Sequence, residues 1–217
     1  MATISEPSGG GISNVTPAAV ANTAGSGWNP ANPAPLGLMG FGITTFVLSM
    51  INANLVGAGA TPMVLGMALA FGGLGQFMAG MWEFRTGNTF GAVAFTAYGA
   101  FWISFYFLVS ADAKLIAPNE VNAALGLYLW AWGIFTGVMF LCSFHAARAV
   151  SVVFILLTAT FIFLGIGNAG GSSSVVHVGG YVGLATAAAA VYTAAGEILH
   201  SAWGRDVIPL GRPAPRV

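Results

Sequence analysis

Long apolar stretches without charged residues follow one another along the chain, separated by short polar connections. Each has about 20 residues, the length at which a helix crosses the hydrocarbon core of a bilayer. The stretches do not alternate between apolar and polar positions, as the strands of a membrane β-barrel would. The pattern predicts an all-α membrane protein with six transmembrane helices, at residues 35–56, 62–82, 89–110, 121–144, 149–167 and 175–196.

The composition excludes several other classes of protein. Of the 217 residues, 57% are hydrophobic and 6% are charged, whereas soluble domains carry about 25% charged residues. So few charges cannot cover a soluble surface, and the expected surroundings are a lipid bilayer. The six Lys and Arg residues form no cluster, which excludes nucleic-acid binding. The single cysteine, Cys142, excludes a disulfide framework and a thiolate metal site, so no metal or cofactor is expected.

The distribution of basic residues predicts the orientation in the membrane. The side that holds both termini and the second and fourth loops carries five arginines, which are Arg85, Arg148, Arg205, Arg212 and Arg216. The other side carries only Lys114. Because cytoplasmic loops hold the excess of Lys and Arg, both termini are expected in the cytoplasm, in a multi-pass protein of the plasma or inner membrane.

Three parts are expected along the chain. Residues 1–31 are rich in Gly, Ala, Ser, Asn and Pro, which favours a disordered cytoplasmic tail. Residues 32–200 form the six-helix transmembrane domain, and residues 201–217 form a cytoplasmic C-terminal tail. The short connections leave no room for an extramembrane domain.

A loose repeat and a stripe of small residues each leave alternatives open. The string at residues 35–38 recurs as residues 124–127. If this repeat is real, two three-helix halves cross the membrane in opposite senses, an arrangement that places a permeation route at their interface. Gly179, Gly183 and Ala187 have the spacing that lets helices approach closely. They are compatible with a narrow pathway, with ordinary helix packing or with an oligomer contact.

The clearest motif, residues 32–42, reads NPAPLGLMGFG and stands where the first helix begins. Pro33 and Pro35 suit a helix start, where the first N–H groups have no partner in the helix. Asn32 can cap some of these donors. The polarised N-terminus would also favour an anion, so capping and anion binding both stay open.

This string resembles the signature of the acetate uptake transporter family, the acetate and succinate permeases of SatP or YaaH type. The resemblance covers residues 32–210 and includes further collinear blocks, which are Glu83 and residues 87–91 (GNTFG), 95–99 (FTAYG), 147–148, 167–168 and 196–197. It implies a homo-hexamer in which each protomer holds its own pore, narrowed by a Phe, a Tyr and a Leu. By resemblance these are Phe41, Tyr98 and Leu157. In the predicted topology they lie about 9, 14 and 12 Å from the cytoplasmic ends of their helices, which is a similar depth.

Neutral polar side chains lie at comparable depth in every predicted helix. They are Thr44, Thr45, Gln76, Thr96, Thr136, Thr158 and Thr186. Hydroxyl and amide groups can replace part of the water that a carboxylate loses, without the tight binding of an arginine. A threonine in a membrane helix can instead bond to its own helix carbonyl. Gln76 must find partners, because a primary amide in a membrane helix is costly to leave unpaired.

Ionisable residues are few and stand near the ends of the predicted helices. Glu83 and Glu197 are candidates for a proton-binding or gating role, or else for interfacial acids paired with an arginine. His177 can titrate in the physiological range or can simply bond at a helix end. The middle of every span lacks a carboxylate and a histidine, so a buried proton relay is not evident.

The leading hypothesis is transport of acetate, and of other short carboxylates such as succinate, either channel-like or coupled to protons. The alternative is a channel for small neutral solutes such as urea or ammonia, because threonine-lined pores suit these equally well. An intramembrane enzyme using Ser172, Ser173 or Ser174 with His177 is not favoured. Its residues have no Gly-x-Ser-x-Gly elbow and no midspan acid to orient the histidine.

Overall fold

The computed structural model describes residues 30–213. The predicted tail at residues 1–31 and Arg216 therefore lie almost wholly outside the described residues. The described part is helical and contains no strand. Its helices are α1 (Ala34–Asn52), α2 (Thr61–Leu69), α3 (Gln76–Thr86), α4 (Thr89–Ser110), α5 (Val121–Cys142), α6 (Arg148–Ala169) and α7 (Ser173–Trp203), with short turns η1 (Ala58–Ala60), η2 (Ala70–Gly75), η3 (Asp112–Leu115) and η4 (Ser143–His145).

The predicted all-α class and the six membrane spans are confirmed. Six helices of the described chain are long and apolar enough to cross a membrane. Five correspond to α1, α4, α5 with η4, α6 and α7, and the sixth runs without a break from η1 through α2 and η2 to α3. The last helix extends to Trp203, beyond the predicted end at residue 196.

The second span contains an irregular turn that the sequence pattern did not reveal. Residues Ala70–Gly75 form a π-helical segment between α2 and α3. Such wide turns are rare and are frequent at functional sites. The segment packs closely on α1, since a Cβ atom on Gly40 would lie 2.7 Å from the carbonyl oxygen of Phe71. The missing side chain of Gly40 is therefore what allows α1 to approach η2.

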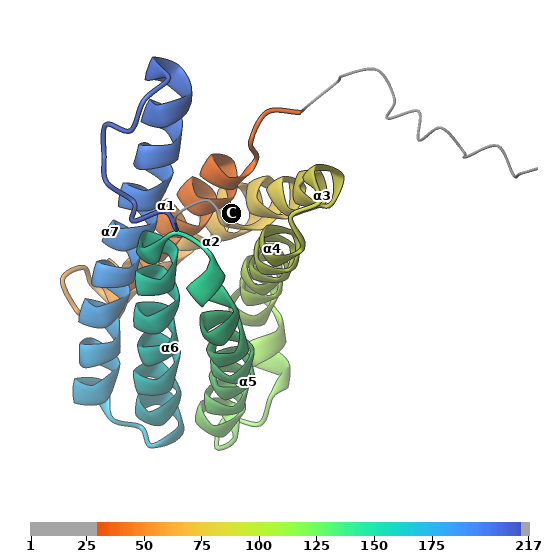
Figure 1. The fold of residues 1–217 in the computed structure, drawn as a ribbon. Coiled ribbons are helices and arrows are strands. Elements are labelled where there is room, and N and C mark those ends of the chain that lie inside the picture. Colours follow the sequence, from red (N-terminus) through yellow and green to blue (C-terminus); the bar gives the residue numbers. More distant parts are fainter. Residues whose placement is uncertain (1–29, 214–217) are drawn as a thin grey trace, which may run out of the picture.

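The long helices pack side by side in a bundle (Figure 1). Helix α7 lies between α1 and α6, α5 packs on α6, and α3 pairs with α4. Close approach of α7 to α1 depends on Gly180 and Gly183, whose added Cβ atoms would lie 2.2 Å from the backbone nitrogen of Ala53 and 2.3 Å from the hydroxyl of Ser49. In this structure these small residues serve helix packing within one protomer. The predicted inverted repeat and oligomer contact stay predictions.

One end of the bundle gathers segments that are far apart in the sequence. The start of α1, the turn between α3 and α4, the turn between α5 and α6, and the residues after α7 meet there. Of the described arginines, all four belong to segments at this end, whereas Lys114 lies in η3 at the other end. The bundle thus has one arginine-rich end, and its assignment to the cytoplasm stays a prediction.

The residues after α7 fold back onto this end, and we call residues 204–213 the C-terminal strap. The backbone N–H groups of Arg148 and Ala149 donate to the carbonyl oxygens of Gly211 and Leu210, at 3.0 Å each. The strap thereby caps α6, whose first N–H groups have no partner in the helix. Leu210 is buried.

Charged groups also hold the strap in place. Arg212 pairs with Glu197 of α7 at 3.1 Å and contacts Asp206. Partial burial alone would lower the pKa of Arg212, but the hydrogen bonds and negative charges of Glu197 and Asp206 together raise it. The arginine therefore stays charged, and the described part of the predicted C-terminal tail is packed against the bundle.

Candidate functional site

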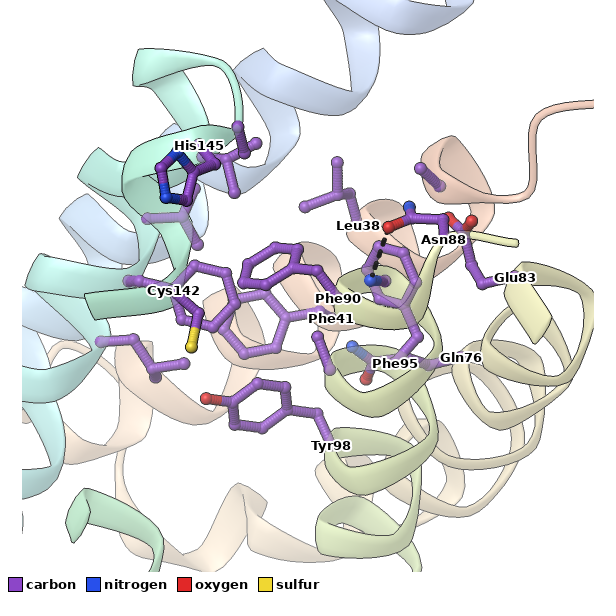
Figure 2. A pocket seen from close by; sticks show the side chains of 18 residues that line it. Leu38, Phe41, Gln76, Glu83, Asn88, Phe90, Phe95, Tyr98, Cys142 and His145 are labelled. Carbon is purple, nitrogen blue, oxygen red and sulfur yellow. Dashed lines mark hydrogen bonds between the residues drawn. The ribbon is translucent and has the colours of Figure 1, made fainter. Parts of the chain in front are cut away.

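A cavity of about 460 Å³ opens at the arginine-rich end and enters the bundle between α1, α3, α4, α5 and α6 (Figure 2). Its walls are largely apolar and aromatic, with a few polar groups near the mouth. It is lined by Ala34, Leu38, Phe41, Gln76, Glu83, Asn88, Phe90, Gly91, Ala94, Phe95, Tyr98, Cys142, His145, Ala146, Val150, Val153, Phe154 and Leu157. We call this space the first cavity.

The turn between α3 and α4 shapes one side of the mouth. Gly87 adopts a φ of 79°, which ends α3 in the left-handed region where glycine is favoured. Asn88 then caps α4, because its side-chain oxygen accepts a hydrogen bond from the backbone N–H of Gly91 at 3.1 Å. These local signals place Glu83 and Asn88 at the same side of the cavity (Figure 2).

A second cavity of about 200 Å³ lies farther along the bundle. It is lined by Phe41, Thr45, Leu48, Ser49, Ile51, Asn52, Thr61, Phe101, Trp102, Phe105, Val109, Leu125, Leu129, Leu157, Thr160, Phe161, Leu164 and Asn168. Phe41 and Leu157 line both cavities. These two side chains therefore stand between the two spaces, and both are buried, with 5% and 4% of their surface exposed.

Tyr98 lines the first cavity beside this pair. Its ring lies 5.8 Å from that of Phe41, centroid to centroid. The hydroxyl of Thr136 donates to the carbonyl oxygen of Trp132 at 2.7 Å, so the Tyr98 hydroxyl, 2.9 Å away, donates to Thr136. The structure thus brings Phe41, Tyr98 and Leu157 together from three helices and fixes the tyrosine by a buried hydrogen bond.

The predicted polar residues fall into two groups. Thr45 and Gln76 line the cavities directly, and Thr136 acts through Tyr98. By contrast, Thr158 and Thr186 line neither cavity, and their hydroxyls donate to carbonyl oxygens of their own helices at 2.7 and 2.9 Å. The sequence left open whether these threonines line a pathway or bond to their own helix. In the structure Thr158 and Thr186 bond to their own helix.

Three further polar residues from the sequence lie outside both cavities. Thr44 is fully buried between α1 and η2, and Thr96 faces Gly80 of α3. Asn32 lies one residue before Pro33, the N-cap of α1; its side chain accepts a hydrogen bond from the backbone N–H of Ala34 at 3.0 Å and donates to Glu197 at 3.4 Å.

The ionisable candidates have very different surroundings. Glu83 is 2% exposed, lines the first cavity and accepts a hydrogen bond from Thr86 at 3.0 Å. Glu197 bonds to Asn32 and Arg212 in the network of the strap. His177 is half-buried near the start of α7 and lines neither cavity. Of the three, Glu83 alone meets a cavity.

Several lining residues were not predicted from the sequence. Phe90, Phe154 and His145 line the first cavity, and Ser49 and Asn168 line the second. Phe90 and Asn168 belong to the collinear blocks, which was a usable signal. The other three occur in apolar or short connecting segments, where nothing in the pattern separates a cavity wall from ordinary packing.

The arrangement suits a small solute with an apolar body and a polar head. Apolar walls accommodate the body, and isolated amide and hydroxyl groups bind the head without a fixed positive charge. Among the described residues, no group of three or more His, Cys, Asp and Glu could hold a metal ion.

Comparison with known proteins identifies relatives along almost the whole chain. Residues 17–205 match the model of the GPR1/FUN34/yaaH family. The chain is 43% identical over 182 residues to the succinate-acetate/proton symporter SatP of Escherichia coli K12, covering 83% of this chain and 95% of that protein. It is 40% identical over 195 residues to acetate permease A of Emericella nidulans, covering 83% of this chain and 65% of the permease. A solved structure of the bacterial acetate channel SatP superimposes with a TM-score of 0.79 and 42% identity, covering 84% of this chain and all of that one.

Proposed function

The chain belongs to the GPR1/FUN34/yaaH family, and we propose that it carries acetate and other short carboxylates such as succinate across the membrane, through a pathway inside each protomer. The resemblance first inferred from residues 32–42 is thereby confirmed. The relatives named above are described as a symporter, a permease and a channel for these acids, which supports transport rather than catalysis.

The observation that carries the proposal is the position of Phe41 and Leu157 between two cavities. A solute that crosses from one cavity to the other must displace or pass these side chains. Tyr98 narrows the approach from the first cavity. An apolar constriction of this kind opposes hydrated ions, and it lets through a small solute whose apolar part replaces water at the wall.

The polar groups on either side of the constriction serve the carboxylate. Gln76 and Glu83 lie in the first cavity, and Thr45 and Ser49 lie in the second. Gln76, Thr45 and Ser49 can donate hydrogen bonds to a carboxylate, and Glu83 can accept one from a protonated acid. None of these groups attracts the substrate as strongly as an arginine would, so release remains fast. The proposal includes a homo-hexamer in the plasma or inner membrane, with each protomer conducting by itself.

Uptake of labelled acetate into vesicles that contain the purified protein tests the function. Uptake above that of protein-free vesicles, suppressed by excess unlabelled acetate and not by urea, is the expected result. A chain that moves urea or ammonia while acetate neither enters nor competes would replace this proposal with the alternative of a neutral-solute channel.

Two neighbouring positions give a matched test of the pathway. Leu157→Trp places a large ring between the cavities and should stop acetate uptake. Leu156→Trp lies on the same helix but lines neither cavity, so uptake should persist. If Leu156→Trp blocks uptake and Leu157→Trp does not, the constriction is misplaced by one residue.

A further inference from the structure

A set of buried polar atoms in the described part of the chain makes no hydrogen bond to another group of the protein. They are Thr44 Oγ1, Thr45 Oγ1, Gln76 Oε1, Glu83 Oε1, Thr96 Oγ1 and Trp102 Nε1. The side chains of Thr44, Gln76, Glu83 and Trp102 are each at most 2% exposed. Buried polar atoms are nearly always satisfied by protein or by ordered water, so these atoms call for partners, and for Glu83 the neighbouring Asn88 amide can supply one.

Other buried hydroxyl groups in the same bundle do have hydrogen-bond partners within the protein. Thr136, Thr160, Thr186 and Thr193 all donate to carbonyl oxygens of their own helices, at 2.7 to 2.9 Å. The atoms without a partner are thus a distinct group, and the membrane environment as such does not account for them.

These atoms gather along one face of the second span. Glu83, Gly80, Gln76 and Gly72 follow one another at spacings of three and four residues, which places them on the same side of α3 and η2. Gly80 faces Thr96 of α4, since an added Cβ would lie 2.3 Å from the threonine hydroxyl. We call this row, with the side chains that face it, the polar seam.

At Gly72 the seam meets α1 and α4 together. An added Cβ on Gly72 would lie 2.8 Å from Thr44 Oγ1 and 2.9 Å from Trp102 Cδ1, the carbon next to the indole nitrogen. The glycine therefore allows a hydroxyl and an indole to pack together against the backbone of η2, and neither Thr44 Oγ1 nor Trp102 Nε1 has a protein partner.

The two ends of the seam reach the two cavities. Glu83 and Gln76 line the first cavity, and Trp102 and Thr45 line the second. From Glu83 to Gly72 the seam is about 16 Å long, from the rise of a helix. On α1, Thr44 faces the seam while Phe41 faces the cavities, so the seam passes beside the apolar constriction.

We propose that water molecules occupy the polar seam and carry protons between the two cavities, beside the path of the carboxylate. A buried water forms two to four hydrogen bonds to polar groups that otherwise have none, which matches the atoms along the seam. During uptake a proton enters at the Trp102 and Thr45 end, each water accepts one proton and donates another, and one proton leaves at the Glu83 end. The groups in contact with Glu83 include Thr86, Asn88 and Gly91, none of which titrates. The titratable residues Cys142 and His145 line the same cavity. This inference rests on the proposed function, because it gives the proton that accompanies the carboxylate a path separate from that of the carboxylate.

The first test removes one seam hydroxyl without changing the packing. Thr44→Val keeps the shape of the side chain, and Thr193→Val is the matched control, because Thr193 is equally buried and bonds to its own helix. Vesicles with an internal pH dye and a clamped membrane potential receive external labelled acetate, and proton entry and acetate entry are measured in parallel. Thr44→Val should lower proton entry per acetate at least fivefold, and Thr193→Val should match the wild type.

The ratio of proton entry to acetate entry also distinguishes this route from transport of the neutral acid. If the proton crosses on the substrate as neutral acid, Thr44→Val keeps the wild-type ratio, and the proposal is overturned. A wild-type chain that moves acetate with no proton overturns it as well.

The second test detects the water directly and needs no transport. Hydroxyl radicals formed by X-ray radiolysis oxidise buried side chains that lie beside bound water. Trp102 should be oxidised in the wild type despite its burial, and oxidation should fall several-fold in Thr44→Val and in Gly72→Ala. Trp102 that stays unmodified in the wild type refutes a hydrated seam. Absence of acetate flux together with oxidised Trp102 would refute the proposed function and its proton route, while leaving the seam hydrated.

Discussion

Shortening Leu157 is the sharpest test of the constriction, because this side chain lines both cavities and stands between them. Leu157→Ala removes three carbon atoms from the wall between spaces of about 460 and 200 Å³. Leu→Ala in a protein core costs about 2 to 5 kcal/mol, with larger losses where more empty space is created. Leu157 borders two cavities and is therefore packed against other side chains over only part of its surface, so its truncation loses fewer contacts than that of an average core leucine. We expect a loss of about 2 kcal/mol and a folded variant.

The expected gain is tolerance of longer substrates. Butyrate has two more methylene groups than acetate, and each buried methylene contributes about 0.8 kcal/mol. If the space opened by Leu157→Ala buries both additional methylene groups, the ratio of butyrate uptake to acetate uptake rises by up to about 15-fold.

The assay compares labelled acetate and butyrate uptake into vesicles, and thermal unfolding in detergent checks folding. Leu164→Ala is the matched control, since Leu164 lies two helical turns away on α6 and lines the second cavity only. An unchanged uptake ratio in folded Leu157→Ala protein, or the same change in Leu164→Ala, would refute the assignment of the constriction.

Three further predictions concern the contacts that support the pathway. Tyr98→Phe and Thr136→Val should each lower the free energy of unfolding by about 1 kcal/mol, as measured by thermal unfolding. The double variant should lose little more than either single variant, because one buried hydrogen bond joins the two residues. Gly180→Ala should destabilise the bundle by at least 1 to 3 kcal/mol, since its methyl group would meet the backbone of Ala53, and size-exclusion chromatography of the purified variant should show loss of folded protein. Arg212→Gln should cost about 1 kcal/mol or less, because the ion pair is partly exposed, yet it should speed amide hydrogen exchange where the strap caps α6.

Each of these predictions has a clear contrary outcome. Additive losses for Tyr98 and Thr136 would mean that the two side chains act separately. A Gly180→Ala variant as stable as the wild type would show that α1 and α7 do not depend on this close approach. Unchanged exchange of the Arg148 and Ala149 amides in Arg212→Gln would mean that the strap is held by Leu210 and its backbone bonds alone.

Local signals in the sequence predicted much of the framework around the site. Asn32 accepts a hydrogen bond from the backbone N–H of Ala34, the first residue of α1, although Pro33 and not Asn32 holds the N-cap position. The spacing of Gly179 and Gly183 indicated close packing of the last helix, although not against which neighbour. Both signals are local, because a helix start and the spacing of small residues are set by residues close together in the chain. Of the alternatives that the small residues left open, packing within the protomer is what the structure contains, and the oligomer contact stays a prediction.

The site was predicted less completely. Phe41, Tyr98 and Leu157 came from the resemblance, and depth along the predicted helices was compatible with their meeting. The roles of the threonines could not be separated, because Thr44, Thr158 and Thr186 look alike in sequence. Only the packing of neighbouring helices decides whether a hydroxyl bonds within its own helix or faces a seam.

The sequence by itself determined that this chain is a six-span helical membrane protein with one arginine-rich end, because the bilayer requires long uncharged runs and the runs are read directly from the chain. Tertiary structure alone decided that Phe41 and Leu157 separate two cavities, that η2 widens the second span, and that buried polar atoms align beside the constriction. These features depend on which faces of distant helices meet. In a membrane the apolar pattern says little about faces, since lipid and protein interior are equally apolar.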